Sequence, residues 1–115
     1  MKNRLEYTRV EPDTEARIRE RIQGDDPEIV AEALYSAVRF IEDRRFVQNA
    51  CLDKLESPQI KIRWAAATCL GDLVYFGGVS NIDRVITALE LAISDPSIAG
   101  PASLSLSMVK QSGIR

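Results

Sequence analysis

Residues 57–77, SPQIKIRWAAATCLGDLVYFG, form the stretch that decides the fold. Ser57-Pro58 predicts a helix start, because serine caps free backbone N–H groups and proline fits the first helical turn. Gly77-Gly78 predicts the end of the helix, because glycine adopts the left-handed conformation of a C-cap. Between them, spacings of four and three place an apolar row on one helical face. The row comprises Ile62, Ala66, Cys69, Leu73 and Phe76.

Helical patterns continue on both sides of this stretch. Asp26-Pro27 predicts the start of a helix that runs to Ile41, and the apolar phase restarts at Arg44. Glu42-Asp43 therefore predicts a turn between two antiparallel helices, although a kink in one long helix would also break the pattern. The six predicted helices cover about residues 12–23, 26–41, 44–55, 57–77, 80–93 and 95–113.

The two ends of the chain give weaker patterns. Residues 1–11 could pack as a flap or form a frayed tail. Ser80 and Asp83 predict a short-armed capping box for the fifth helix. In the sixth, Gly100-Pro101 disturbs the first turns and the serines are poor helix formers. Apolar residues alternate over positions 104–108, which would also fit a strand, but a helix is favoured.

Three turns of the sequence share one pattern. DPEI at 26–29, SPQI at 57–60 and DPSI at 95–98 each lie between two amphipathic helices. Their prolines, Pro27, Pro58 and Pro96, recur at an interval typical of helical solenoids, in which each helix pair buries its face against the next.

The pattern resembles HEAT repeats over roughly residues 12–110. The second repeat matches best, with Ile62-Arg63 at the Val-Arg position of the family, then Ala65–Ala67 and Leu70-Gly71, but it carries two extra residues after Pro58. In the first repeat, which matches through Ile29, Ala33, Ala37 and Val38, Val30 replaces the arginine. The third keeps only Asp95, Pro96 and Ile98. An irregular helical bundle that reuses Asp-Pro as a helix start is the alternative.

This resemblance implies an all-α fold, an α-α superhelix of about three HEAT-like helical hairpins that forms a single domain over residues 1–115. It implies a right-handed stack in which the second helix of each hairpin lines a shallow concave face and the first lines the convex face. Proteins of this family usually bind other proteins, and most are not enzymes.

Composition narrows the function further. The chain has 115 residues, no histidine and a formal net charge of −2, so it lacks the commonest general base and attraction to nucleic acid or anionic membranes is not expected. Residues 22–56 carry eight acids against four bases, which favours a basic partner. Cys51 and Cys69 fit reduced core residues. No signal-peptide run or membrane span is present, so we expect a soluble, cytoplasmic protein.

No catalytic, metal or cofactor site is predicted. The acidic pairs Asp25/Asp26 and Glu42/Asp43 lie at helix starts and breaks, where capping and solvation explain them. The run DDPE lacks the glycine and the spaced acids of a calcium loop. Gly77-Gly78 is not followed by the GK[ST] of a phosphate loop.

The remaining aromatic and charged residues favour a protein-binding surface over a catalytic site. Trp64 and Tyr75 lie on a second stripe of the central helix, with Thr68 and Gly71 between them. Aromatic anchors rimmed by charge are typical of protein-binding hot spots, although Trp64 and Tyr75 could instead pack against the next repeat. The predicted partner-binding residues are Glu28, Glu32, Tyr35, Arg39, Glu42, Asp43, Trp64 and Tyr75.

These features favour a non-enzymatic protein-binding module. By overall profile the chain resembles small bacterial immunity proteins, which bind and block a toxin, here possibly a nuclease with a basic cleft. The first alternative is a generic scaffold, assembly factor or complex subunit. A nucleic-acid-binding helical repeat is less favoured, because its concave face would carry too many acids. The sequence leaves the oligomeric state open.

Overall fold

A computed structural model describes residues 14–113, which form six α-helices and no strand. The helices are α2 (Thr14–Ile22), α3 (Pro27–Phe40), α4 (Arg44–Lys54), α5 (Ile60–Asp72), α6 (Ile82–Ala92) and α7 (Ala99–Gly113). The all-α prediction is therefore confirmed, and the strand alternative for residues 104–108 is wrong. The flap or tail predicted for residues 1–11 lies outside the described residues. Within them, no helix is both long and apolar enough to cross a bilayer.

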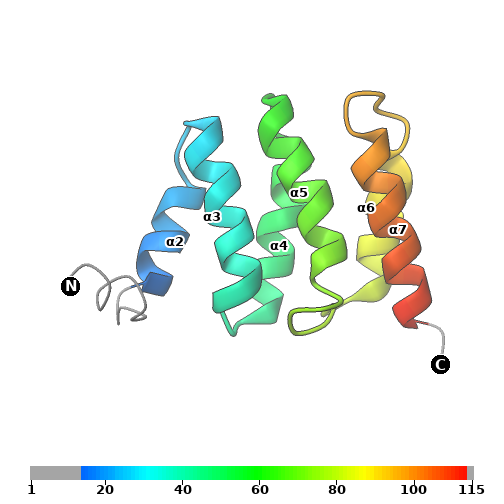
Figure 1. Cartoon of the computed structure of the whole chain (residues 1–115), viewed down its shortest axis with the longest axis horizontal. Helices are drawn as coiled ribbons and strands as arrows, with labels where there is room; N and C mark the ends of the chain where they lie inside the picture. The colour runs from blue at the N-terminus through cyan, green and yellow to red at the C-terminus, as the bar shows by residue number, and fades with distance from the viewer. Residues whose placement is uncertain (1–13, 114–115) are drawn as a thin grey trace, which may run out of the picture.

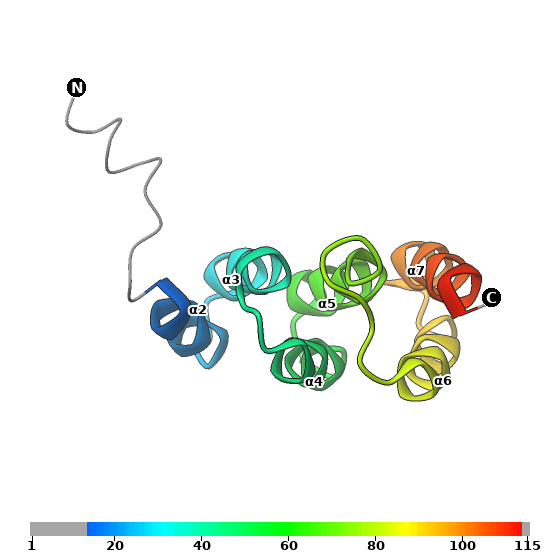
Figure 2. The same cartoon turned by 90° about the horizontal axis from the view of Figure 1, so that it is seen from below.

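The helices pair in chain order and lie in two layers. Figure 1 shows α3, α5 and α7 side by side, and Figure 2 shows α4 and α6 in a second layer beneath them. α2 packs against α3 at one end of the row, α4 packs against α5, and α6 packs against α7. Each helix of the first layer also packs directly against the next, so α5 lies at the centre of the molecule.

Burial repeats along the chain in register with the hairpins. The buried positions of α3 begin at Val30, those of α5 at Ile62 and those of the α7 segment at Ile98. Val30, rather than the exposed Ile29, is therefore the counterpart of Ile62, which corrects the alignment of the first repeat. The equivalent buried positions are 30, 33, 34, 37 and 41; 62, 65, 66, 69 and 73; and 98, 101, 102, 105 and 109. The first helix of each pair (α2, α4 and α6) buries two apolar residues four apart: Ile18 and Ile22, Val47 and Cys51, Val85 and Leu89.

The break between α3 and α4 confirms the prediction of two helices. Ile41 leaves helical geometry with φ −88° and ψ 120°, yet its side chain is fully buried. Asp43 caps α4 by accepting a hydrogen bond from the Phe46 N–H at 3.0 Å. Arg44 closes the turn, because its guanidinium donates to the carbonyl oxygens of Val38 and Ile41 at 3.1 and 2.8 Å. These bonds satisfy carbonyl groups that the end of α3 leaves free.

The central helix is shorter than predicted at both ends. Ser57 does not cap it: its hydroxyl accepts from the Gln59 N–H at 3.1 Å, and α5 begins only at Ile60. The two extra residues after Pro58 account for this delay. α5 ends at Asp72, and a series of turns continues to Gly77 and Gly78, whose φ angles of 131° and 91° close the segment. Phe76 therefore leaves the predicted core row and is 40% exposed.

The starts of α6 and α7 also differ from prediction. Asn81, not Ser80, caps α6 by accepting from the Arg84 N–H at 3.2 Å. The reason lies in α4: the buried side chain of Gln48 accepts the N–H groups of Ser80 and Asn81 at 2.8 and 2.9 Å. α7 begins at Ala99 rather than directly after Asp95-Pro96. The start of α6 thus depends on a contact from α4 that the local pattern does not contain.

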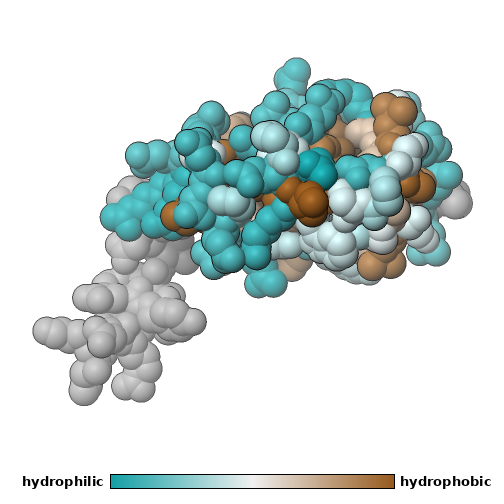
Figure 3. Space-filling model, turned by 90° about the horizontal axis from the view of Figure 1, so that it is seen from above, coloured by the Kyte–Doolittle hydropathy of each residue, from teal (hydrophilic) through white to brown (hydrophobic). Residues whose placement is uncertain are grey.

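The three turns that carry the shared pattern lie along one edge of the molecule and are linked to one another (Figure 1). Gln59 donates from its side chain to the Asp25 carbonyl at 3.5 Å. Arg63 donates to the Ser57 carbonyl at 2.9 Å, to the Asp95 carboxylate at 3.1 Å and to the Ser97 hydroxyl at 3.0 Å. Seen from this edge, the surface is largely hydrophilic, with separate hydrophobic patches (Figure 3). Polar links therefore join neighbouring hairpins along this edge.

Replacing Arg63 with methionine is expected to lower the free energy of unfolding by about 1–3 kcal/mol. The substitution removes a partly buried cation, and the three oxygen acceptors at Ser57, Asp95 and Ser97 lose their donor. Urea unfolding followed by circular dichroism measures the change. Lys61→Met is the matched control, since Lys61 is exposed and makes only a surface ion pair with Glu28 at 3.1 Å. Equal stability of the two variants would show that the Arg63 links do not hold the hairpins together.

The same hydrogen bonds make the contribution of Asp95 to folding stability depend on pH. Hydrogen bonds from the Ser97 hydroxyl and N–H, together with the Arg63 cation, hold the pKa of Asp95 below its ordinary value of 3.8. A depressed pKa in the folded state means that the carboxylate stabilises the fold above pH 3.8 and that this contribution is lost as the pH falls through the folded pKa. Asp95→Asn should therefore destabilise the protein at pH 7 and should approach wild-type stability well below pH 3.8. A stability difference that is constant with pH would contradict this prediction.

Candidate protein-binding surfaces

The predicted partner-binding residues are all exposed, but they do not form one patch. Glu28, Glu32, Tyr35 and Arg39 lie on α3, Trp64 lies on α5, and Tyr75 lies in the turns after α5. The structure therefore decides the open question about the aromatic stripe: Trp64 is 48% exposed and Tyr75 is 73% exposed, so neither is a core residue. Gly71, which the sequence places between them on the same stripe, is buried instead.

Side-chain contacts show that the outer faces of α3 and α5 are continuous. Lys61 on α5 pairs with Glu28 on α3 at 3.1 Å. Arg39 on α3 lies 5.1 Å from the ring centre of Phe76 beyond α5. Arg39 also acts on Asp72 of α5: burial raises the pKa of Asp72, and the arginine charge opposes that rise. Charged residues of α3 are thus tied to the α5 segment along its length.

Tyr35 lies at the same junction. Its side chain is 37% exposed and lies near Thr68 of α5. Burial raises the pKa of the Tyr35 hydroxyl, which therefore stays protonated at neutral pH. The residue offers an aromatic edge and a neutral polar group to a partner.

Glu42 and Asp43 lie in the turn after α3, at the opposite end of that helix from Glu28, and a helix of this length spans roughly 20 Å. The Asp43 carboxylate caps α4 and lies 3.8 Å from the Arg19 guanidinium. Asp43 therefore has a structural role, which separates it from the residues around Trp64.

A groove between α5 and α7 contains Trp64. It has a volume of about 360 Å³ and is bordered by Leu104, which is 66% exposed, and by Met108. At the floor of this region α5 and α7 approach closely at Gly71, where an added Cβ would lie 2.5 Å from the Ser105 hydroxyl oxygen. Its remaining lining residues are Thr68, Asp72, Gly100, Pro101 and Ser105.

Sequence reasoning missed several apolar side chains of this face. Leu104 was not assigned because Gly100-Pro101 and the serines obscured the helical phase of α7. Phe76 is predicted in the core row because the pattern continues the central helix to Gly77, but α5 ends at Asp72. We define the aromatic face as Tyr35, Trp64, Tyr75, Phe76 and Leu104.

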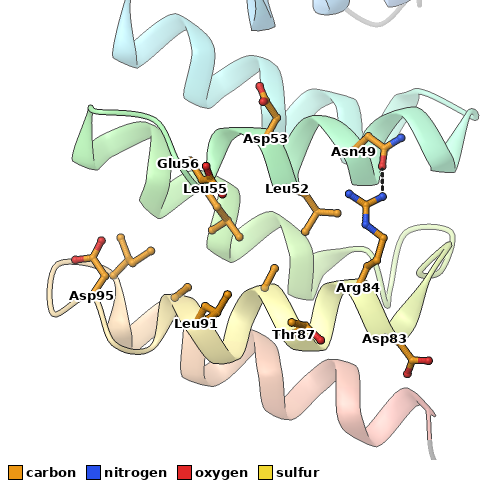
Figure 4. A pocket seen from close by; sticks show the side chains of 13 residues that line it. Asn49, Leu52, Asp53, Leu55, Glu56, Asp83, Arg84, Thr87, Leu91 and Asp95 are labelled. Atoms are coloured by element: carbon orange, nitrogen blue, oxygen red, sulfur yellow. Dashed lines mark hydrogen bonds between the residues drawn. The ribbon is translucent and has the colours of Figure 1, made fainter.

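A second and larger groove lies in the other layer, between α4 and α6 (Figure 4). Its volume is about 900 Å³, and no sequence pattern predicts it. α4 and α6 contact each other far less than the helices of the first layer do. Arg84 of α6 reaches across one end and donates to the Asn49 side chain at 3.0 Å. Leu52 and Leu55 point from the α4 side toward α6.

The two cysteines are buried free thiols, as predicted. Cys51 of α4 and Cys69 of α5 adjoin each other, and the neighbouring thiol and burial both raise the pKa of Cys69. A thiol with a raised pKa is a poor nucleophile, because the thiolate is the reactive form. Among residues 14–113, no group of three or more acidic or cysteine side chains is arranged to hold a metal ion.

Comparison with protein-family models, with curated proteins and with solved structures found no match to the chain.

Proposed function

We propose that the chain is a non-enzymatic protein-binding module whose partner docks on the aromatic face, with Trp64 as the central anchor. The observation that carries this proposal is the exposure of Trp64 beside an open groove. A tryptophan at this position leaves a large apolar ring in water, and its burial by a partner is favourable. Clustered exposed apolar residues are typical of interaction sites, whereas scattered ones are ordinary.

The surroundings of Trp64 support the role of an anchor. Leu104 and Met108 form the apolar wall of the groove opposite the indole, and Thr68 and Asp72 supply polar groups along the same groove. In a binding hot spot, the anchor loses its contact with water when the partner binds, and a surrounding rim excludes water. Arg39 is held near Phe76 and Asp72, so a partner would meet a positioned cation at the edge.

Charge favours a basic partner. Glu28 is paired with Lys61, but Glu32 makes no ion pair within residues 14–113 and remains exposed near Tyr35 on the same helix. A lysine or arginine of a partner would find an available carboxylate there. In the narrower form of the proposal, the partner is a toxin with a basic cleft and this chain is its immunity protein. A scaffold or complex subunit is the alternative form, and it would use the same face.

Site-specific photocrosslinking in the native cell tests the proposal. A photoreactive phenylalanine analogue at position 64 should capture one dominant protein, identified by mass spectrometry. The matched control places the analogue at position 20, which is exposed on α2, a helix that α3 separates from α5 (Figure 1). Equal crosslinking from both positions to the same mixture of proteins would contradict a dedicated binding face. A basic toxin as the captured protein would support the narrower form, and a subunit of an assembly would support the alternative.

A further inference from the structure

The α4–α6 groove differs from the aromatic face in both position and chemistry. Its apolar lining consists of leucine, isoleucine and alanine side chains without aromatic residues. Leu91 is 72% exposed, more than any other leucine among residues 14–113, and it is part of this lining. An exposed leucine within a concave apolar strip indicates a surface that a partner can cover. The apolar lining residues are Leu52, Leu55, Ala88, Leu91, Ala92 and Ile98.

The rim of the groove is acidic. Glu56 on the α4 side and Asp83 on α6 make no ion pair within residues 14–113, and Asp53 approaches only its neighbour Lys54, at 4.0 Å. The one basic residue of the lining, Arg84, donates to Asn49 at 3.0 Å. Carboxylates therefore lie along an apolar strip with little compensating charge. A ligand with cations beside apolar side chains would complement both features.

The shape of the groove fits a helix. α4 and α6 each contain 11 residues and run along opposite sides of the groove, so its walls are roughly 16 Å long. Figure 4 shows α5 behind the space between them. A helix of three to four turns would match this length. It would lie in the space between α4 and α6, which hardly contact each other. Helix-in-groove recognition uses apolar anchors at spacings of three and four along one face.

We propose that the α4–α6 groove binds an amphipathic helix of a protein partner, with a leucine-rich face toward Leu52 and Leu91 and with lysine or arginine residues beside Asp53, Glu56 and Asp83. The groove lies in a different layer from the aromatic face, so this inference does not depend on the function proposed above. With the aromatic face and the α4–α6 groove both occupied, the chain would bind two protein segments at once.

A designed peptide tests the groove directly. The probe is a fluorescein-labelled 14-residue peptide with leucines at spacings of three and four and lysines elsewhere, titrated with the full chain and followed by fluorescence anisotropy. Saturable binding is expected, and it should weaken as salt increases, because the rim contributes through charge. A peptide with glutamate in place of every lysine should not bind. Failure of the lysine peptide to bind, or equal binding of the glutamate peptide, would overturn the proposal.

Two exposed leucines provide matched variants. Leu91→Asp should weaken binding of the lysine peptide about tenfold or more, because an apolar anchor is lost. Leu104→Asp, at a similarly exposed leucine on the aromatic face, should leave the affinity unchanged. The opposite result would place the peptide on the aromatic face and overturn the proposal. Analytical ultracentrifugation of the chain alone completes the test: a dimer that Leu91→Asp dissociates would show that a second copy fills the groove, which also overturns it.

Discussion

Replacing Gly71 with valine is expected to lower the free energy of unfolding by about 3 kcal/mol, a large part of the stability of a domain of this size. An added Cβ at Gly71 would lie 2.5 Å from the Ser105 hydroxyl oxygen, 2.9 Å from its Cβ and 3.0 Å from its Cα. The last of these is a backbone atom, so a side-chain rotation cannot relieve the contact. Valine adds two further methyl groups, and α5 and α7 must separate to accept them. Chemical denaturation measures the loss.

Two companion variants show whether the loss comes from this contact. Gly100→Ala changes another glycine that faces the same groove, but no atom lies within 4 Å of an added Cβ there. Its stability should be unchanged or should rise by up to about 1 kcal/mol, because alanine is the better helix former. Ser105→Gly removes two of the three close atoms and should restore part of the stability of Gly71→Val. A Gly71→Val protein as stable as wild type would contradict the close packing of α5 and α7.

The helices and most of the core could be predicted because their signals are local. Pro27 and the spacing of Ala33, Leu34 and Ala37 lie within a single helix, and the apolar phase predicts which side faces inward. The break at Glu42-Asp43 is also predictable from local sequence, since Asp43 is a good N-cap for the residues that follow it. Periodicity thus predicts each helix without knowledge of its neighbours.

Helix ends were less accurate because distant groups set them. Ser80 is a good capping residue, but the buried Gln48 of α4 binds the Ser80 and Asn81 N–H groups, and α6 starts one residue later than a Ser80 cap would require. In the α6–α7 turn, Asp95 accepts from the Ser97 N–H and binds Arg63 of α5 instead of capping α7. Contacts from another helix cannot be predicted from the residues around the helix end.

The surfaces could be predicted only in part, for the same reason. Helical phase places Trp64 off the core row, but whether a neighbour covers it depends on the distance between α5 and α7. That distance is set by Gly71 and Ser105, which lie in different repeats. The α4–α6 groove depends on two helices that do not pack together, and a missing contact between helices has no sequence pattern.

The central claim is that a protein partner anchors on Trp64. Truncation of a tryptophan hot spot costs roughly 2–4 kcal/mol of binding free energy, so Trp64→Ala should weaken binding about 30-fold to 1000-fold. Trp64→Phe should retain part of the affinity, because it keeps an aromatic ring in the groove. Glu20→Ala, on the exposed face of α2, is the control and should bind as wild type does.

The most direct measurement is therefore the dissociation constant of the partner captured at position 64, determined by isothermal titration calorimetry with wild type, Trp64→Ala and Glu20→Ala. Trp64 is the only tryptophan of the chain, so a blue shift of its emission on complex formation, with a partner that lacks tryptophan, provides an independent record of its burial. We predict a loss of affinity for Trp64→Ala alone, with its thermal unfolding unchanged. A Trp64→Ala protein that binds the partner as tightly as wild type would contradict the proposed binding face.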